Sequence, residues 1–238
     1  MSGHSHWAGI KQRKGVNDAK RAKIFTVLAK PIVIAAQAGG GNPDTNFQLR
    51  AAIDKALSYN MPKANIDRAV KRGSGELKGD KMEEVIYEAK GPGNVMMLVK
   101  ATTDKKNRTL GEVKTVLTKN GGKFGEAGSS MWNFDPVGAI IIETDENSNL
   151  EELEMVAIDA GAKDMKTEEG AFIIFTEPTE LQKVQDKLKA SGQKIAEANL
   201  SYLPKTIAEI DPATKEAYEK LLEVLDELDD VDEIFDNL

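Results

Sequence analysis

Residues 137–176 read VGAIIIETDENSNLEELEMVAIDAGAKDMKTEEGAFIIFT, and residues 180–202 continue as ELQKVQDKLKASGQKIAEANLSY. Short apolar runs alternate here with segments of helical period, and glycines separate neighbouring elements. The pattern predicts the order strand, helix, strand, strand, helix, strand, with the bounds Val137–Thr144, Leu150–Ala160, Asp164–Glu168, Ala171–Thr176, Glu180–Ser191 and Ile195–Tyr202. This is the element order of the ferredoxin-like fold, which hosts many unrelated functions and therefore predicts no activity.

The N-terminal third has a helical pattern. One helix is predicted over Asp18–Ala38, and its apolar residues recur on one face: Phe25, Leu28, Ile32 and Ala36. Pro31 lies inside this helix and predicts either a bend near Val27 or two separate helices. A second helix is predicted from Thr45, with the apolar face Leu49, Ala52, Ile53, Ala56 and Leu57. A third follows Pro62 and ends at Gly73, burying Ile66, Ala69 and Val70.

The remaining segments mix strands and helices. A β-hairpin is predicted from Glu83–Ala89 and Val95–Thr102, which flank a Gly-Pro-Gly-Asn turn. A helix over Arg108–Lys119 follows, capped by Asn107 or Asp104. The tail predicts a helix over Ala213–Leu225 and a last strand over Val231–Phe235. The fold class expected from all segments is α+β.

Composition excludes several classes of protein. The chain has 238 residues, 40% of them hydrophobic and 30% charged, as in ordinary globular proteins. The absence of cysteine excludes disulfides and zinc–thiolate sites. No apolar run approaches the roughly 20 residues that span a bilayer, and no apolar signal core begins the chain. We therefore expect a cytoplasmic protein without a membrane partner.

Charge is distributed unevenly along the chain. Residues 1–80 contain 14 Lys or Arg and 6 Asp or Glu, which gives +8, whereas the rest gives −15, so that the net charge is −7. Such opposite charges indicate separate electrostatic roles. The basic part attracts polyanions, and the acidic part repels nucleic acid from its own surface.

The strongest local bias lies in residues 1–30, which contain seven Lys or Arg and the single acid Asp18. A glycine-rich basic arm carrying Trp7 runs into a helix whose lysines fall opposite its apolar face. This arrangement suits phosphate backbones, with Trp7 either stacking on an unpaired base or packing on Phe25. The residues expected to contact nucleic acid are Trp7, Lys11, Arg13, Lys14, Lys20, Arg21, Lys23, Lys30, Lys63, Arg68, Lys71 and Arg72.

A simpler explanation exists for several of these cations. The lysines of the first helix are also what the solvated side of an amphipathic helix carries. Arg68, Lys71 and Arg72 complement the dipole at the end of the third helix. The Asn-Met-Pro turn at residues 60–62 does not favour a helix-turn-helix reader of DNA.

No catalytic constellation is evident, so we expect no enzyme. His4 and His6 form a His-x-His pair, but no nearby carboxylate or thiol completes a metal site. Asp229, Asp230 and Asp232 lack the glycine and distal glutamate of a calcium loop. We expect neither a metal nor a cofactor.

Three sets of motifs resemble the YebC/PmpR family of probable transcriptional regulators, to which mitochondrial translational activators are related. The first is Gly3-His4-Ser5 with Trp7, Asp18-Ala19-Lys20-Arg21 and Lys23-Ile24-Phe25-Thr26. The second is Gly39-Gly40-Gly41, Asn60-Met61-Pro62-Lys63 and Lys71-Arg72-Gly73. The third is Gly91-Pro92-Gly93, Asn107-Arg108-Thr109 and Gly125-Glu126 with Gly128-Ser129. The match is close over the first 130 residues and looser afterwards.

The resemblance implies three domains: a basic helical domain (1–79), an α/β domain (80–134 with 203–238) and an inserted ferredoxin-like domain (135–202). Both α/β domains would be ferredoxin-like in type. The family implies a non-catalytic, nucleic-acid-binding regulator of gene expression. The partner is DNA, in a transcriptional regulator, or ribosomal RNA, in a ribosome-associated translation factor that activates translation or relieves stalling. A monomer is the favoured state.

Overall fold

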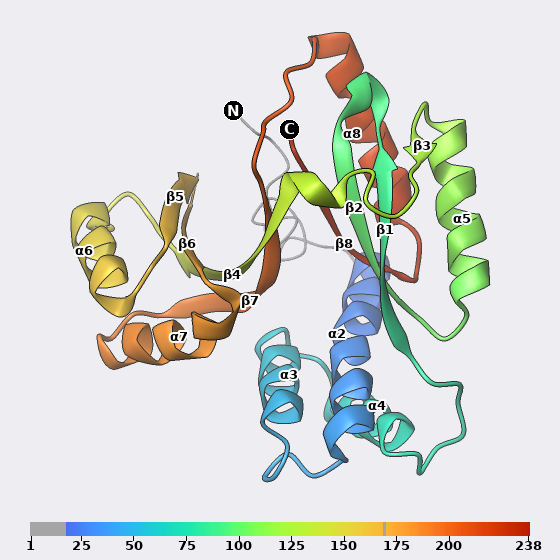
Figure 1. Cartoon of the computed structure of the whole chain (residues 1–238). Helices are drawn as coiled ribbons and strands as arrows, with labels where there is room; N and C mark the ends of the chain where they lie inside the picture. The colour runs from blue at the N-terminus through green and yellow to red at the C-terminus, as the bar shows by residue number, and fades with distance from the viewer. Residues whose placement is uncertain (1–17, 169) are drawn as a thin grey trace. The chain divides into compact units, whose positions relative to one another are not determined.

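The structure is a computed structural model that describes residues 18–168 and 170–238, with side chains from residue 23 onward (Figure 1). The described residues form two compact units. The larger unit consists of residues 18–131 and 208–236, and the smaller unit of residues 132–207 and 237–238. No helix in the described part of the chain is long and apolar enough to cross a membrane.

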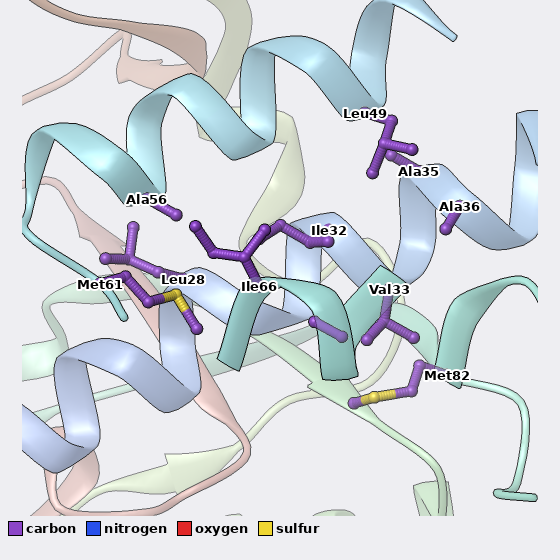
Figure 2. Packing of buried hydrophobic residues seen from close by; sticks show 11 residues of the cluster. Leu28, Ile32, Val33, Ala35, Ala36, Leu49, Ala56, Met61, Ile66 and Met82 are labelled. Carbon is purple, nitrogen blue, oxygen red and sulfur yellow. The ribbon is translucent and has the colours of Figure 1, made fainter. Parts of the chain in front are cut away.

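Three helices open the larger unit: α2 (Asp18–Gly39), α3 (Phe47–Ser58) and α4 (Lys63–Gly73). Their apolar faces share one core, which Figure 2 shows from close by. Its buried members are Leu28, Ile32, Val33, Ala35, Ala36, Leu49, Ala56, Met61, Ile66, Ala69 and Met82. Most residues of the predicted apolar faces are here, as amphipathic helices require. Leu57 is the exception, because half of its surface remains exposed.

Pro31 does not divide the first helix. The backbone is helical without interruption from Asp18 to Gly39, so the alternative of two helices is wrong. The Pro31 ring lies on the exposed side, while Ile32 and Val33 beside it are buried. Tertiary packing on both sides of the proline therefore holds the helix together despite the missing hydrogen bond.

Two close contacts set the geometry of the helices. Asn46 caps α3 by accepting from Leu49 N at 3.1 Å, and its amide donates to the carbonyls of Ala35 and Gly40. At the end of α4, a Cβ on Gly73 would lie 2.5 Å from the Val33 carbonyl oxygen. Only glycine permits this approach of α4 to α2.

The sheet of the larger unit has the order β3-β1-β2-β8 and is antiparallel. Its strands are β1 (Glu83–Lys90), β2 (Met96–Thr103), β3 (Lys123–Phe124) and β8 (Val231–Asp236). The 3-10 turn Pro92–Asn94 joins β1 to β2 and confirms the predicted hairpin. Helices α5 (Lys106–Lys119) and α8 (Pro212–Asp226) contact the sheet and each other. The last strand thus pairs with β2, far from it in sequence.

The smaller unit has the six elements that the sequence predicts. They are β4 (Phe134–Glu143), α6 (Leu150–Ala160), β5 (Asp164–Glu168), β6 (Ala171–Thr176), α7 (Leu181–Ala190) and β7 (Ile195–Pro204). Short 3-10 turns at Met131–Asn133 and Pro178–Glu180 precede β4 and α7. The antiparallel order β5-β6-β4-β7 and the helices α6 and α7 form the ferredoxin-like arrangement (Figure 1). The α+β fold class is confirmed.

Two local expectations differ from the structure. Helix α5 begins two residues earlier than predicted, after Lys105, and no side chain caps it, so the caps proposed at Asn107 and Asp104 are wrong. Strand β3 was not predicted, because two residues, Lys123 and Phe124, carry no periodicity. It forms only by pairing with the end of β1.

Candidate nucleic-acid interface

Helix α4 presents a basic face to solvent. Ile66 and Ala69 are buried against α2 and α3, which turns Arg68 and Lys71 outward at helical spacing. Lys63 is exposed at the start of the helix. The described residues give Lys63, Arg68 and Lys71 no ion pair. These three predicted site residues are therefore accessible cations on one short helix.

Arg72 belongs to the same helix but is engaged within the protein. Its Nη2 lies 3.2 Å from Asp104 Oδ2, and Arg108 Nη2 lies 3.4 Å from the other oxygen of that carboxylate. Asp104 thus connects α4 to the first turn of α5. Arg72 retains a partly exposed side chain, so it contributes to the basic surface with much of its charge already balanced.

Asp230 pairs with the same Nη2 of Arg108 and holds it more closely. Its Oδ2 accepts hydrogen bonds from Thr109 Oγ1 at 2.6 Å, Arg108 Nη2 at 2.8 Å and Thr103 Oγ1 at 3.0 Å. Burial raises the pKa of Asp230, but these hydrogen bonds prevail and hold it below its ordinary value. A carboxylate therefore stays ionised beside Arg108 and fixes its orientation.

A groove of about 520 Å³ lies among these elements within the larger unit. Its apolar lining comes from α2, α4, the turn before α4 and the segment before β1, and includes Phe25, Ala29, Val33, Met61, Ala69 and Met82. Its polar lining is of mixed charge: Arg68, Arg72, Arg108, Asp104, Asp229 and Asp230. Among these arginines, Arg68 is the one without a carboxylate partner in the described part of the chain, so its charge is the least balanced of the three.

Lys30 is a correction to the predicted interface. It was expected on the solvated face of the first helix, but it is 5% exposed. Its ammonium donates to Asp232 Oδ1 and to the Asp229 carbonyl oxygen, each at 2.7 Å. The helical face that carries Lys30 is covered by the loop before β8, which no helical pattern reveals. Lys30 is therefore occupied within the protein and does not offer a cation to a ligand.

Lys23 is partly covered as well. Its ammonium lies 3.5 Å from Asp226 Oδ2, and a quarter of its side chain is exposed. Trp7, Lys11, Arg13 and Lys14 lie outside the described residues, as do His4 and His6 and the side chains of Lys20 and Arg21. Their proposed phosphate contacts stay predictions. Within the described residues, no three or more His, Cys, Asp or Glu side chains gather to hold a metal ion.

Arg108 and Asp230 are absent from the residues that charge patterning selected. Charge alone gives Arg108 no emphasis, since it begins an ordinary helix with other cations. Its place in the Asn107-Arg108-Thr109 motif was the available signal. Asp230 stands in an acidic tail in which no residue is distinguished by pattern.

Comparisons with known proteins agree on one family. Residues 5–76 match the family described as TACO1/YebC protein N-terminal domain, and residues 82–238 match TACO1/YebC second and third domain. The chain is 48% identical over 238 residues to a "probable transcriptional regulatory protein" of Caldanaerobacter subterraneus subsp. tengcongensis, covering 100% of this chain and 98% of that protein. A protein of the same name from Thermotoga maritima is 46% identical over 237 residues, covering 100% and 93%.

The fold comparison reaches the same group. The crystal structure of a conserved hypothetical protein from Aquifex aeolicus has 44% sequence identity and a TM-score of 0.90, covering 98% of this chain and 96% of that one. Sequence and fold therefore match along almost the whole length. The chain belongs to the TACO1/YebC family.

Proposed function

We propose that this protein is a non-catalytic regulator of gene expression that binds nucleic acid through backbone phosphates. The observation that supports the proposal best is the exposed basic face of α4. Lys63, Arg68 and Lys71 stand there without an acidic partner among the described residues, in a chain whose net charge is −7. Such a local cluster on an acidic protein attracts a polyanion to one place and repels it elsewhere.

The names of the relatives favour DNA as the partner. Both relatives described above are called probable transcriptional regulatory proteins. We therefore propose a DNA-binding transcriptional regulator, in a cytoplasm that holds both candidate partners. Lys11, Arg13, Lys14, Lys20, Arg21 and Lys23 would add phosphate contacts, and Trp7 a stacking contact with an unpaired base.

One observation favours the alternative, a translation factor that binds ribosomal RNA. The exposed face of α4 carries Lys63, Asp67, Arg68 and Lys71 but no exposed Asn or Gln, which would pair with adenine in a major groove. A charged surface that lacks exposed amides recognises backbone and shape, and this is how proteins bind double-stranded RNA. DNA and ribosomal RNA remain the two candidate partners.

A paired experiment tests the proposal. Binding to promoter DNA and co-sedimentation with ribosomes are measured at physiological salt for the full chain, for R68Q/K71Q and for the control K189Q/K194Q. The control removes two exposed lysines of the smaller unit. For R68Q/K71Q we expect the log–log salt slope on duplex DNA to become shallower by about 2. Failure of the unaltered protein to bind either partner would overturn the proposal, and preferential binding to ribosomes would establish the alternative.

A further inference from the structure

A second basic segment lies in the acidic part of the chain. Residues 105–123 contain six Lys or Arg and one acid, Glu112, whereas the whole of residues 81–238 has a net charge of −15. The segment comprises helix α5 and the short strand β3. This segment is separate in sequence from the basic N-terminal arm and from α4, so its positive charge needs an explanation of its own.

The cations of this segment divide into two groups. Lys106 pairs with Glu83, and Arg108 with Asp104 and Asp230, so these two have internal partners. Lys105, Lys114, Lys119 and Lys123 are exposed, and the described residues give them no ion pair. Acids are close at hand, because α5 contacts α8, which carries several glutamates. All four lysines are nevertheless exposed.

The strand pairing adds a local conflict. Lys123 of β3 stands directly opposite Lys90 of β1 in the antiparallel register, so both side chains leave the same face of the sheet. Like charges in this position destabilise a strand pair, which here is only two residues long. On the other face of β3, the Lys114 ammonium lies 4.6 Å from the centre of the Phe124 ring. Departures from a local rule of this kind are typical of functional surfaces.

The exposed side of α5 is also shaped for close approach. Asn107, Gly111, Thr115 and Thr118 recur along it, with Lys114 and Lys119 on its two sides. A Cβ on Gly111 would meet no atom within 4 Å, so the surface beside it is open. Lysine and asparagine side chains are ordinary donors to phosphate and sugar oxygens. The hydroxyls of Thr115 and Thr118 already donate to the carbonyls of Gly111 and Lys114, so these two residues keep the surface low.

This surface continues from the basic face of α4. Asp104 receives Arg72 of α4 on one oxygen and Arg108 of α5 on the other. Helix α5 has 14 residues and is therefore about 21 Å long. The cations run from Arg68 and Arg72 past the start of α5 to its far end and β3.

We propose that α5 and the sheet edge at β3 form a second phosphate-binding surface, made by Lys105 directly before α5, by Lys114 and Lys119 of α5 and by Lys123 of the edge strand, along which a nucleic acid held at α4 continues. The inference rests on the proposed function and extends it to a named part of the acidic region. Lys119 also complements the dipole at the end of α5. That role does not explain Lys114, Lys105 or the pair of Lys90 and Lys123.

The test uses the full chain with K114Q/K119Q/K123Q and the control K183Q/K189Q/K194Q, which removes the same charge from the smaller unit. Binding to a mixed-sequence DNA duplex and to a single-stranded RNA of the same length is measured over a salt series. For the α5 variant on the duplex, we expect a slope shallower by about 2.7 and a loss of affinity on the order of 100-fold at about 0.1 M salt. On RNA the slope should change by about 2. The control should behave as the unaltered protein does.

Acetylation footprinting gives a readout that requires no substitution. Bound nucleic acid should protect Lys114, Lys119 and Lys123 of the unaltered protein from acetylation and leave Lys183 and Lys189 reactive. Equal slopes for both triple variants, together with unprotected α5 lysines, would overturn the inference. If R68Q/K71Q still weakened binding in that case, the proposed function would stand. If the unaltered protein bound neither probe, both proposals would fail.

Discussion

Lys30 Nζ lies 2.7 Å from Asp232 Oδ1 across a separation of 202 residues, and this buried ion pair fastens α2 to β8. Six per cent of the Lys30 side chain and 14% of the Asp232 side chain are exposed. Burial raises the pKa of Asp232 above its ordinary value, while Lys30 acts in the opposite direction. The pair therefore connects the helical core to the sheet, at the cost of removing both charges from water.

Removing one partner should be more harmful than removing both. We expect Lys30→Met to lower the free energy of unfolding by about 3–5 kcal/mol, because a carboxylate stays buried without its counter-ion. The double variant K30M/D232N should recover much of this loss. Urea denaturation measures both, and an equal loss in the single and double variants would contradict the assignment.

The Lys30→Met variant should also depend on pH. Without Lys30 the pKa of Asp232 rises further, because burial is then opposed less strongly, by Thr102 and Lys100. A raised carboxyl pKa in the folded state means that stability falls as pH increases through it. The loss relative to the unaltered protein should therefore be smaller at about pH 5 than at about pH 8. Urea midpoints at the two values decide this.

Glu88 holds the loop that follows β3. Its carboxylate accepts from the backbone N–H groups of Gly128 and Ser130 at 2.6 Å each, and of Met131 at 2.7 Å. We expect Glu88→Gln to cost about 1–3 kcal/mol, because an amide cannot accept on both sides. Denaturant unfolding at neutral pH gives the value, and Glu84→Gln on the same strand serves as the exposed control.

Acid should weaken the Glu88 anchor. Burial raises the pKa of Glu88, but the N–H donors of Met131, Ser130 and Gly128 outweigh it, and the pKa lies below the ordinary value of 4.5. The stabilisation is therefore present above that value and is lost as pH falls through the lowered pKa. The Glu88→Gln variant should show a smaller loss of stability on acidification than the unaltered protein. If the stability of the two proteins fell equally on acidification, this role of Glu88 would be contradicted.

Two helical glycines should respond oppositely to alanine. At Gly73 the added Cβ would lie 2.5 Å from the Val33 carbonyl oxygen and 2.6 Å from Ala36 Cβ, so Gly73→Ala should cost about 1–3 kcal/mol. At Gly111 the added atom enters open space, and Gly111→Ala should stabilise α5 by about 0.5–1 kcal/mol. Thermal unfolding of the two variants tests whether each substitution raises or lowers the stability. If Gly73→Ala also stabilised the protein, α4 would be able to move away from α2.

We propose that the ferredoxin-like segment is a domain inserted between residues 80–134 and 203–238, after a helical domain that ends near residue 79. Asn133 Oδ1 accepts from Thr206 N at 3.1 Å and from Thr206 Oγ1 at 2.6 Å. These hydrogen bonds join the segment that enters the proposed domain, before β4, to the segment that leaves it, after β7. A fragment of residues 132–207 should unfold cooperatively. The shorter fragment 137–202 should be less stable, because it lacks this tie and the ends of β4 and β7. Absence of a cooperative transition in the longer fragment would count against insertion.

The sequence by itself determined most elements and the fold class. The sequence predicts α2, α3 and α4 and the order of elements in the smaller unit, because one face of each element must avoid water and is therefore apolar at a regular spacing. The exposure of the α4 cations is predictable for the same reason: burying the apolar residues of a short amphipathic helix leaves its polar residues on the solvent side.

Only the tertiary structure decided which cations are available. Lys30 follows the helical pattern of an exposed residue, yet it is buried, because the loop before β8 supplies the Asp229 carbonyl and β8 supplies the Asp232 carboxylate as its partners. Strand β3, the continuous α2 through Pro31 and the opposition of Lys90 and Lys123 depend likewise on partners distant in sequence. Local pattern reports which side of an element is apolar, whereas the identity of what covers each side is set by long-range packing.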